Sequence, residues 1–405
     1  MRPKITSEHN QRWRLFDYGA YIIERLIGRL SAGTLEILLP NGKYLIFTGH
    51  EQPEISAQWH IHRTRAIRRL LTGGAVGFAE AYLDGDWSTS SLPDLLRLAA
   101  FNDAAMAPRT QGLLLQRLVH RLQHLANNNS RRRARRNISY HYDLGNAFYG
   151  AWLDESMTYS SALFTRADMS LAEAQNAKLD RLADVADIKG GVNVLEIGCG
   201  WGSFLERASK RTRGQLTGIS ISERQSKYAR QRIAAQSISN ASVELCDYRD
   251  VTGSFDRIVS IEMFEAVGEK YWPTYAQTIK RLLRHDGKGA LQVITIDESR
   301  FEQYRKSADF IQRYIFPGGM LPSKPRLSEI FSGANMRITD SLSFGRDYAT
   351  TLGHWREQFL AAWPSLRELG FDERFKRMWD YYFAYCESGF LSGSIDVVQM
   401  RVEHA

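Results

Sequence analysis

Residues 194–204, VLEIGCGWGSF, join an apolar run to three alternating glycines, Gly198, Gly200 and Gly202. A glycine turn between a strand and a helix lets backbone N–H groups approach a ligand at the carboxyl edge of a sheet. An acid, Glu196, precedes the first glycine by two positions. The pattern lacks the sixth-position glycine of a dinucleotide fingerprint and the Lys-Ser/Thr of a P-loop. The turn therefore predicts a bound ligand of another class.

Two later segments narrow the class of that ligand. The strand-like run LTGISIS (216–222) and the segment CDYRD (246–250) follow the turn after successive strands. With Glu196, they fall where class I methyltransferases contact S-adenosylmethionine. Hydride transfer would need a ribose-binding acid at the end of the second strand, where Ser220 and Ser222 stand instead. A methyl donor is the ligand that fits this context.

Seven motifs are spread along the chain after residue 138. They are YHYDLGNAFYGAWLDESMTYSSALF (140–164), LEIGCGWGSF (195–204), GISISERQ (218–225), FDRIVSIEMFEAVGEKYW (255–272), IFPGGMLPS (315–323), DYATTLGHW (347–355) and GSIDVVQ (393–399). In these motifs, from about Ile138 to its end, the chain resembles the cyclopropane-fatty-acid synthase family of S-adenosylmethionine-dependent lipid methyltransferases. The resemblance implies methyl transfer to a cis double bond within an acyl chain of a membrane phospholipid.

The same resemblance implies which residues hold the methyl donor. A hydroxyl and an amide can bond ribose hydroxyls, an aromatic ring can cover adenine, and a carboxylate can accept from its exocyclic amine. The expected set is Tyr159, Ser160, Gly198, Gly200, Trp201 and Gly202 around the methionine part, Ser220 and Gln225 near the ribose, and Asp247 and Tyr248 beside the adenine.

Ring-forming members of the family hold a bicarbonate ion as the base that removes a proton from the carbocation, using a cysteine, a glutamate, a histidine and a tyrosine. Glu265 and Tyr348 match this set, but Ser161 replaces the cysteine and Gln292 replaces the histidine. Neutral glutamine cannot shuttle a proton as imidazole does. The product is therefore left open between a cyclopropane and a methyl-branched unsaturated chain, the latter formed from a monoene or a diene.

Without an anion as base, two other assignments remain open. A carboxylate, Glu265 or Glu262, could remove the proton directly, although Glu262 could equally be a solvated or salt-bridged acid. His354 could substitute for the missing histidine in space. Aromatic residues in 304–316 and 375–390 are candidates for lining a dry acyl tunnel, and they could equally be ordinary core residues.

Helix-like and strand-like segments alternate from about residue 170 to the end. This pattern predicts an α/β fold, a class I methyltransferase-type doubly wound mixed sheet with helices on both faces. A small α+β domain is expected before it, containing a hairpin over residues 33–49 that turns at Asn41-Gly42. Three short helices are expected within residues 59–74, 75–87 and 91–102.

The domain boundaries follow from composition. Residues 111–126 form an amphipathic helix-like stretch, and residues 127–137 combine a polar tract with five arginines. We expect a lipid- or membrane-associated domain at 1–126, an arginine-rich linker at 127–137 and the methyltransferase domain at 138–405. Residues 1–136 contain 20 Lys+Arg and 11 Asp+Glu, so the excess positive charge lies in this part of the chain.

Charge and composition also limit the partners and the compartment. The basic part suits peripheral association with an anionic membrane surface, while the absence of a base-reading motif argues against a nucleic-acid partner. Cys199, Cys246 and Cys386 show no paired spacing, so neither disulfides nor a metal site are expected. No secretory signal is recognisable, so the expected location is the cytoplasm, at the inner face of the membrane. Two-domain members of the family are often dimers, which leaves a homodimer open.

Overall fold

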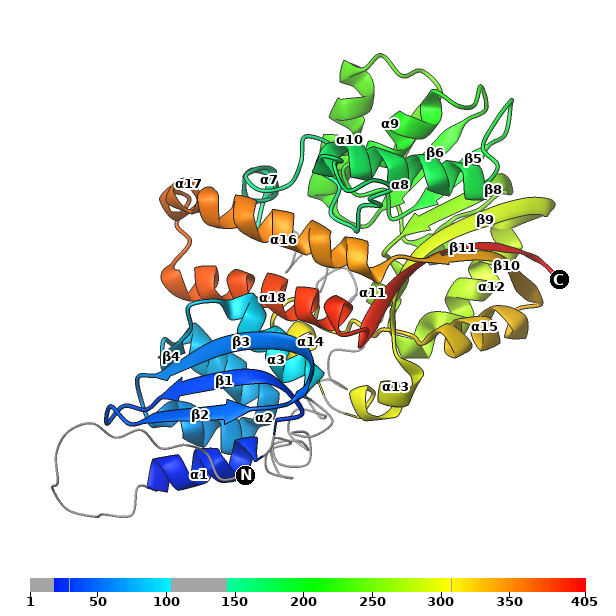
Figure 1. Ribbon diagram of the computed structural model, residues 1–405. Helices are drawn as coiled ribbons and strands as arrows, with labels where there is room; N and C mark the ends of the chain where they lie inside the picture. Colours follow the sequence, from blue (N-terminus) through cyan, green and yellow to red (C-terminus); the bar gives the residue numbers. More distant parts are fainter. Residues whose placement is uncertain (1–17, 29, 103–143, 307) are drawn as a thin grey trace, which may run out of the picture.

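The computed structural model describes residues 18–28, 30–102, 144–306 and 308–405. These residues form a four-stranded sheet of order β2-β1-β3-β4 and a seven-stranded sheet of order β10-β11-β9-β8-β5-β6-β7. Figure 1 shows the smaller sheet, in blue, at one end of the molecule and the larger sheet, in green, yellow and red, at the other. The chain therefore divides between two layered units, as the sequence predicts.

The small sheet confirms the predicted hairpin. β1 and β2 pair antiparallel from Thr34 opposite Thr48 to Leu38 opposite Tyr44, and Gly42 in the turn has a φ of 82° that favours glycine. β3 pairs parallel to β1, and its alternate residues are buried against the core. The strands are β1 (Ala32–Leu38), β2 (Tyr44–Thr48), β3 (Glu51–Ile61) and β4 (Trp87–Ser88).

Two of the expected helices in this unit are corrected by the structure. Trp59 does not begin a helix, because it pairs with Ile37 of β1 as part of β3. The helix starts at Arg65 and continues through a non-helical kink at Gly74, so the two predicted segments form one element. The expected helix from 91 is confirmed, with Ser91 as its N-cap. The helices are α1 (Tyr18–Ile27), α2 (Arg65–Leu83) and α3 (Leu92–Phe101).

The seven-stranded sheet is mixed, as predicted. β9, β8, β5, β6 and β7 run parallel, whereas β11 and β10 pair antiparallel beside β9. All parallel strands therefore end at one edge, where a doubly wound sheet binds its ligand. The strands are β5 (Val194–Ile197), β6 (Leu216–Ser220), β7 (Ala241–Leu245), β8 (Phe255–Ile261), β9 (Leu283–Ile296), β10 (Met336–Ser343) and β11 (Ile395–His404).

Helices cover both faces of this sheet and bury separate apolar clusters. One cluster joins α8, α9 and α10 to the sheet, and the other joins α12 and α15 to the opposite face. The helices are α7 (Asn146–Gly150), α8 (Leu171–Val185), α9 (Ser203–Ser209), α10 (Glu223–Ala235), α11 (Phe264–Val267), α12 (Trp272–Leu282), α13 (Glu298–Tyr304), α14 (Phe310–Tyr314) and α15 (Lys324–Gly333). Two 3-10 turns, η1 and η2, span Tyr248–Asp250 and Glu269–Tyr271.

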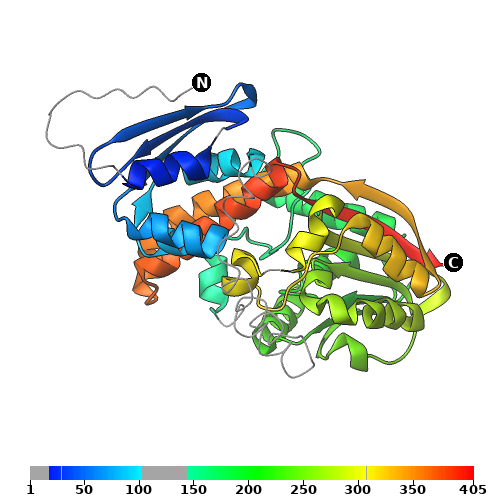
Figure 2. The same cartoon turned by 90° about the horizontal axis from the view of Figure 1, so that it is seen from below.

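A helical insertion between β10 and β11 connects the two units. α16 (Gly345–Ala361) and α18 (Glu373–Leu391) lie between the sheets in both views, and α17 (Trp363–Glu368) joins them at the end away from the large sheet (Figures 1 and 2). The Tyr82 hydroxyl of α2 donates to Asp380 of α18 at 2.7 Å, and the Tyr314 hydroxyl donates to Glu80 at 2.7 Å. This insertion carries α18 against both units, so it can border a site that they share.

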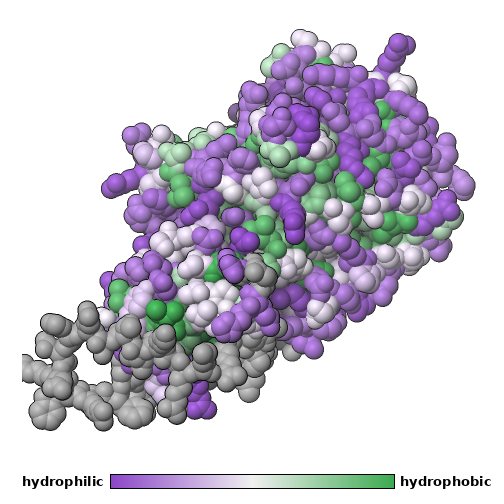
Figure 3. All heavy atoms as spheres, in the orientation of Figure 1, coloured by the Kyte–Doolittle hydropathy of each residue, from purple (hydrophilic) through white to green (hydrophobic). Residues whose placement is uncertain are grey.

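The predicted amphipathic stretch at 111–126 and the arginine-rich linker at 127–137 lie outside the described residues, as does the domain boundary. Within the described part, Arg63, Arg65 and Arg69 converge on the buried Asp86. Among the helices described, none combines the length and the apolar character that crossing a bilayer requires. The view in Figure 3 shows a mainly hydrophilic face with hydrophobic residues toward its middle.

Candidate active site

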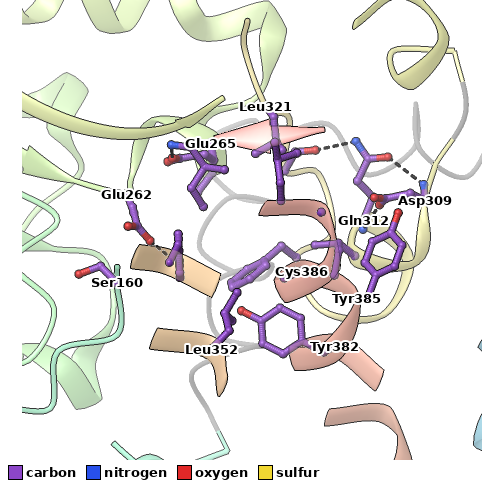
Figure 4. A pocket seen from close by; sticks show the side chains of 18 of the residues that line it. Ser160, Glu262, Glu265, Asp309, Gln312, Leu321, Leu352, Tyr382, Tyr385 and Cys386 are labelled. Carbon is purple, nitrogen blue, oxygen red and sulfur yellow. Dashed lines mark hydrogen bonds between the residues drawn. The ribbon is translucent and has the colours of Figure 1, made fainter. Parts of the chain in front are cut away.

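A cavity of about 650 Å³ opens beyond the carboxyl ends of the parallel strands. The turns after β5, β6 and β8 form one wall, and side chains of α16 and α18 form another. Leu35, Trp59 and Leu96 of the small unit extend the lining. Figure 4 shows Ser160 and Glu262 at one side of this space and Asp309 and Tyr385 at the opposite side. The cavity therefore has a polar end at the sheet and a mainly apolar remainder, which also contains the carboxyl group of Asp309 on the side opposite Glu262.

The glycine turn after β5 borders the polar end. Gly198 and Gly200 line the cavity with φ values of 84° and 51°, and a Cβ on Gly200 would meet no heavy atom within 4 Å. Glu196 also lines this end; it is 2% exposed, and one carboxylate oxygen lacks a hydrogen-bond partner. Burial raises the pKa of Glu196 to about 8. A ligand cation here would supply the partner that this buried acid lacks.

The residues expected near the ribose and adenine all line the cavity. The Ser220 hydroxyl at the end of β6 donates to Gln225 Oε1 at 3.1 Å. The Asp247 carboxylate is held by Arg249 through hydrogen bonds of 2.8 and 2.6 Å. Each carboxylate oxygen can accept a second bond, so an adenine amine could share this acid with Arg249. The Tyr248 ring lies beside it on the cavity wall.

Of the other residues expected to bind the methyl donor, most line the cavity and one packs behind it. Tyr159, Ser160 and Trp201 line the cavity, and the Tyr159 hydroxyl lies 2.8 Å from that of Tyr382. Gly202 instead begins α9 in a left-handed conformation, where a Cβ would lie 3.0 Å from that of Ala229. Gly202 thus allows the turn to pack closely on α10. The residues expected to hold the methyl donor fit S-adenosylmethionine. Glu196 can bind its ammonium group, and the residues at the ends of β6 and β7 can bind its nucleoside.

The residues expected from the sequence to be catalytic gather around a different carboxylate, Glu262, from the one that the family resemblance favours, Glu265. Glu262 Oε1 accepts from the Ser161 backbone N–H at 2.8 Å and from Gln292 Nε2 at 2.7 Å. Its Oε2 accepts from the Tyr348 hydroxyl at 2.7 Å. Three of the four groups implied to hold bicarbonate therefore hold the carboxylate of Glu262, which also lines the cavity.

The backbone at Glu262 places this carboxylate. Glu262 follows β8 with a φ of 47°, a left-handed conformation that is uncommon for residues with a side chain and costs about 1–3 kcal/mol. Its backbone N–H donates to the Gln292 carbonyl at 2.8 Å, which fixes the turn to β9. Burial raises the pKa of Glu262, and the hydrogen bond from Tyr348 and the charge of Lys178 oppose this rise. Glu262 is thus a buried carboxyl group whose hydrogen bonds favour the ionised form against the effect of burial.

Glu265 lies one turn further along, at α11, and has a different environment. One of its oxygens accepts from the Ile294 backbone N–H, while the other has no hydrogen-bond partner. Burial and the nearby Glu262 raise the pKa of Glu265 to about 8. The expected catalytic pair is therefore split: Tyr348 bonds Glu262, and Glu265 is a neighbouring carboxyl that is largely protonated at neutral pH.

This pKa predicts how stability depends on pH. Between about pH 4.5 and 8, folded Glu265 keeps a proton that the unfolded chain has released, so its contribution to stability declines as pH rises. We expect Glu265→Gln to gain stability relative to the parent across this range, by up to about 1.4 kcal/mol per pH unit. Urea unfolding at pH 5, 6.5 and 8 measures the difference. The control is Glu302→Gln, at an exposed position, whose stability difference from the parent should not change with pH. A stability difference between Glu265→Gln and the parent that stays constant over this pH range would contradict a buried, protonated Glu265.

Ser161 and Gln292 are brought to the site, whereas His354 is not. The Ser161 hydroxyl donates to the Ala162 carbonyl, so only the backbone N–H of Ser161 reaches Glu262. Gln292 is 1% exposed and lies behind Glu262. His354 stacks on Phe164 with ring centroids 6.0 Å apart, and it does not line the cavity. The structure therefore places His354 outside the group of residues that bond Glu262.

Sequence reasoning missed two polar residues that support the site. Lys178 of α8 is fully buried, and its Nζ donates to Ser160 Oγ at 2.6 Å. Gln399 of β11 is also fully buried and donates to Gln292 Oε1 at 2.9 Å. The signal for Lys178 was available, because it shares the apolar face of an amphipathic helix with Leu171, Ala174 and Leu182.

All three cysteines lie within the residues that the structure describes. Cys199, Cys246 and Cys386 are all free. Burial raises the pKa of the Cys199 thiol well above its usual range, so this cysteine is an unreactive thiol behind the turn. Across the described ranges, no group of three or more His, Cys, Asp or Glu side chains could hold a metal ion.

Comparison with known proteins defines the family. Residues 129–400 match the family model for mycolic acid cyclopropane synthetase. A tuberculostearic acid methyltransferase of Mycobacterium tuberculosis is 42% identical over 87% of this chain and 84% of its own length. The cyclopropane-fatty-acyl-phospholipid synthase of Escherichia coli is 35% identical, covering 82% of this chain and 84% of its own.

A solved structure shows the same architecture. Mycolic acid cyclopropane synthase CmaA1, complexed with SAH and CTAB, aligns with a TM-score of 0.62 and 32% identity over 66% of this chain and 97% of its own. The chain belongs to the cyclopropane synthase family. It is an S-adenosylmethionine-dependent lipid methyltransferase, which confirms the cofactor, the fold class and the family expected from the sequence.

Proposed function

We propose that this enzyme methylates the double bond of an unsaturated acyl chain in a membrane phospholipid and releases a methyl-branched, unsaturated chain without closing a ring. The observation that carries the proposal is the carboxylate of Glu262, held toward the cavity by Ser161, Gln292 and Tyr348. The carboxylate of Glu262, a base that belongs to the chain itself, accepts the hydrogen bonds that a bicarbonate ion would need. The catalytic cycle therefore requires no bicarbonate.

The chemistry that this site must support is electrophilic. Bound S-adenosylmethionine supplies an electrophilic methyl group. The π electrons of the acyl double bond form the new C–C bond and leave a carbocation on the chain. The aromatic rings of Tyr159, Phe316 and Tyr382 surround the cavity near Glu262 and can stabilise positive charge through their π faces. The apolar lining of the cavity also excludes water, which would otherwise add to the carbocation.

The fate of the carbocation depends on the base. Glu262 takes a proton from a carbon next to the cation, and the C–H electrons form the new carbon–carbon double bond. A 1,2-hydride shift first places the cation on the methylated carbon when the product carries a methylene group. Two features favour this outcome over ring closure: the altered residues at 161 and 292, and 42% identity to a tuberculostearic acid methyltransferase compared with 35% to the cyclopropane synthase.

The shape of the cavity supports a long acyl substrate. Both aromatic-rich stretches named from the sequence contribute to its lining, through Tyr304, Ile311 and Phe316 and through Tyr381 to Phe390. The apolar side chains of the small unit continue this lining away from Glu262. We infer that residues 1–126 form a lipid-associated domain that shares the acyl chamber with a methyltransferase domain at 138–405. Peripheral association with an anionic membrane, and a homodimer, remain parts of this proposal.

Product analysis tests the proposal. The purified protein is mixed with vesicles of oleoyl phosphatidylglycerol and S-adenosylmethionine that carries ¹³C in its methyl group. We expect the label in the phospholipid acyl chain as an alkene CH₂ or a methyl branch, read by carbon NMR after lipid extraction. Label in a cyclopropane CH₂ would overturn the proposed product. In a parallel reaction that contains free oleic acid in place of the vesicles, label in the fatty acid together with no label in the phospholipid would overturn the phospholipid substrate. A protein-free reaction is the control.

A further inference from the structure

A row of hydrogen-bonded side chains runs from Glu262 at the cavity across β9 and β11 to Arg181 of α8. β9 and β11 are paired antiparallel, and their register places Gln292 directly opposite Gln399. Gln292 reaches Glu262 at the cavity, and Gln399 reaches Arg181 on α8. The row therefore joins a partly exposed cation, with 24% of its side chain exposed, to the buried base.

Every hydrogen bond in the row has the same direction. Arg181 Nη1 donates to Gln399 Oε1 at 2.9 Å, and Gln399 Nε2 donates to Gln292 Oε1 at 2.9 Å. Gln292 Nε2 then donates to Glu262 Oε1 at 2.7 Å. Hydrogen bonds in such a chain polarise one another in the same sense. The last N–H group of the row, on Gln292, is therefore more positively polarised where it faces the Glu262 carboxylate.

The two ends of the row fix the direction of both amides. An amide side chain can rotate by 180° and exchange its oxygen for its nitrogen, but arginine can only donate and an ionised carboxylate can only accept. If Gln399 turned over, its NH₂ group would face Arg181. If Gln292 turned over, its oxygen would face Glu262. Each reversal replaces a donor–acceptor contact with a repulsive one.

Backbone carbonyls reinforce this direction. Gln399 Nε2 also lies 3.3 Å from the Lys178 carbonyl, and Gln292 Nε2 lies 3.3 Å from the Ser161 carbonyl. Both are acceptors that a reversed amide would leave facing an oxygen. Gln399 is 0% exposed and Gln292 is 1% exposed, so water cannot compensate a reversed amide.

We propose that Arg181 and Gln399 are positioning residues that hold the Gln292 amide in the orientation in which it donates to Glu262. This inference rests on the proposed role of Glu262 as the base. Neither residue touches the cavity, so their effect on turnover passes through the amide of Gln292. Arg181 fixes the orientation of the Gln399 amide, and Gln399 in turn fixes the orientation of the Gln292 amide across the β9–β11 pair.

The groups that face Glu262 from other elements are unchanged by substitution of Arg181. They are Lys178 from α8, Glu265 from α11, Tyr348 from α16 and Tyr382 from α18. If the acid limb of the pH–rate profile moves in an Arg181 variant, the movement therefore reports a change in the hydrogen bonds of the row that ends at Glu262. Substrate binding should remain as before, because Arg181 is outside the cavity.

The test compares Arg181→Met, Arg181→Lys and Gln399→Leu with the parent enzyme. We expect Arg181→Met to lower kcat about tenfold and to move the acid limb of kcat upward by about half a pH unit, with unchanged KM. Lysine also only donates, so Arg181→Lys should restore most of the activity. Gln399→Leu should behave like Arg181→Met. Calorimetry with S-adenosylhomocysteine should give the same affinity for all variants.

Arg211→Met is the matched control, because Arg211 also bonds α8, at Asp180 and Asp184, but lies outside the row. The proposal is overturned if Arg181→Met keeps the profile of Arg211→Met, or if Arg181→Lys is impaired as strongly as Arg181→Met. Failure of the proposed function has a different signature: Glu262→Gln would then retain turnover, whatever the Arg181 variants do.

Discussion

Glu262→Gln is expected to lower kcat for acyl methylation at least about 100-fold, the usual range for loss of a general base. The variant keeps the volume of the side chain but cannot accept the proton. Because the hydrogen-bond partners of Glu262 are Ser161, Gln292 and Tyr348 and not residues expected to hold the methyl donor, the affinity for S-adenosylhomocysteine should change less than about twofold. Initial-rate assays with labelled methyl donor measure the first quantity, and calorimetry measures the second.

A second substitution at the same position separates a base from a structural acid. Glu262→Gly removes the carboxylate and leaves Gln292, Tyr348 and the Ser161 N–H facing the space it occupied. Glycine also accepts the φ of 47° without strain. We expect added bicarbonate to restore part of the activity of Glu262→Gly and none of the activity of Glu262→Gln, which fills the space. Equal behaviour of the two variants would contradict the assignment.

Lys178→Met is expected to have the second large effect. Lys178 is buried, and its charge lowers the pKa of Glu262. Removing that charge raises the pKa of Glu262 further, so a smaller fraction of the base is ionised at a given pH. We expect kcat at pH 7 to fall about tenfold or more, with the acid limb moving upward by about one unit.

The pH profile distinguishes this effect from general damage to the fold. Burial lowers the pKa of Lys178 itself to about 8, so in the parent enzyme its charge is present below that pH and is lost above it. The difference between the parent and Lys178→Met should therefore narrow above pH 8. The control is Lys189→Met, whose side chain is 77% exposed. A parallel loss of activity at all pH values would contradict the electrostatic role.

Much of the methyltransferase unit could be predicted because its signals are local. The strand, glycine turn and helix at 194–209 follow from adjacent residues, and the predicted alternation of elements gives the sheet. In the small unit, β3 was missed and a helix was expected at Trp59. There the pairing with β1, which depends on residues about 20 positions away, decides the structure of the segment.

The choice between Glu262 and Glu265 could not be made from the sequence. The two acids are three positions apart at the end of β8, and family resemblance favoured Glu265. The left-handed backbone at Glu262 directs its carboxylate to Ser161 and Gln292, which come from distant parts of the chain. Likewise, the role of Gln399 depends on the register of β11 against β9, which no local pattern specifies.

The most direct test of the central claim is turnover without bicarbonate. The parent enzyme is assayed on oleoyl phosphatidylglycerol vesicles in degassed buffer under a carbon-dioxide-free atmosphere, with and without added bicarbonate. If Glu262 is the base, the rate and the ¹³C-labelled, ring-free product should be the same in both conditions. A rate that falls when bicarbonate is removed and recovers when it is added would show that an external anion, and not Glu262, accepts the proton.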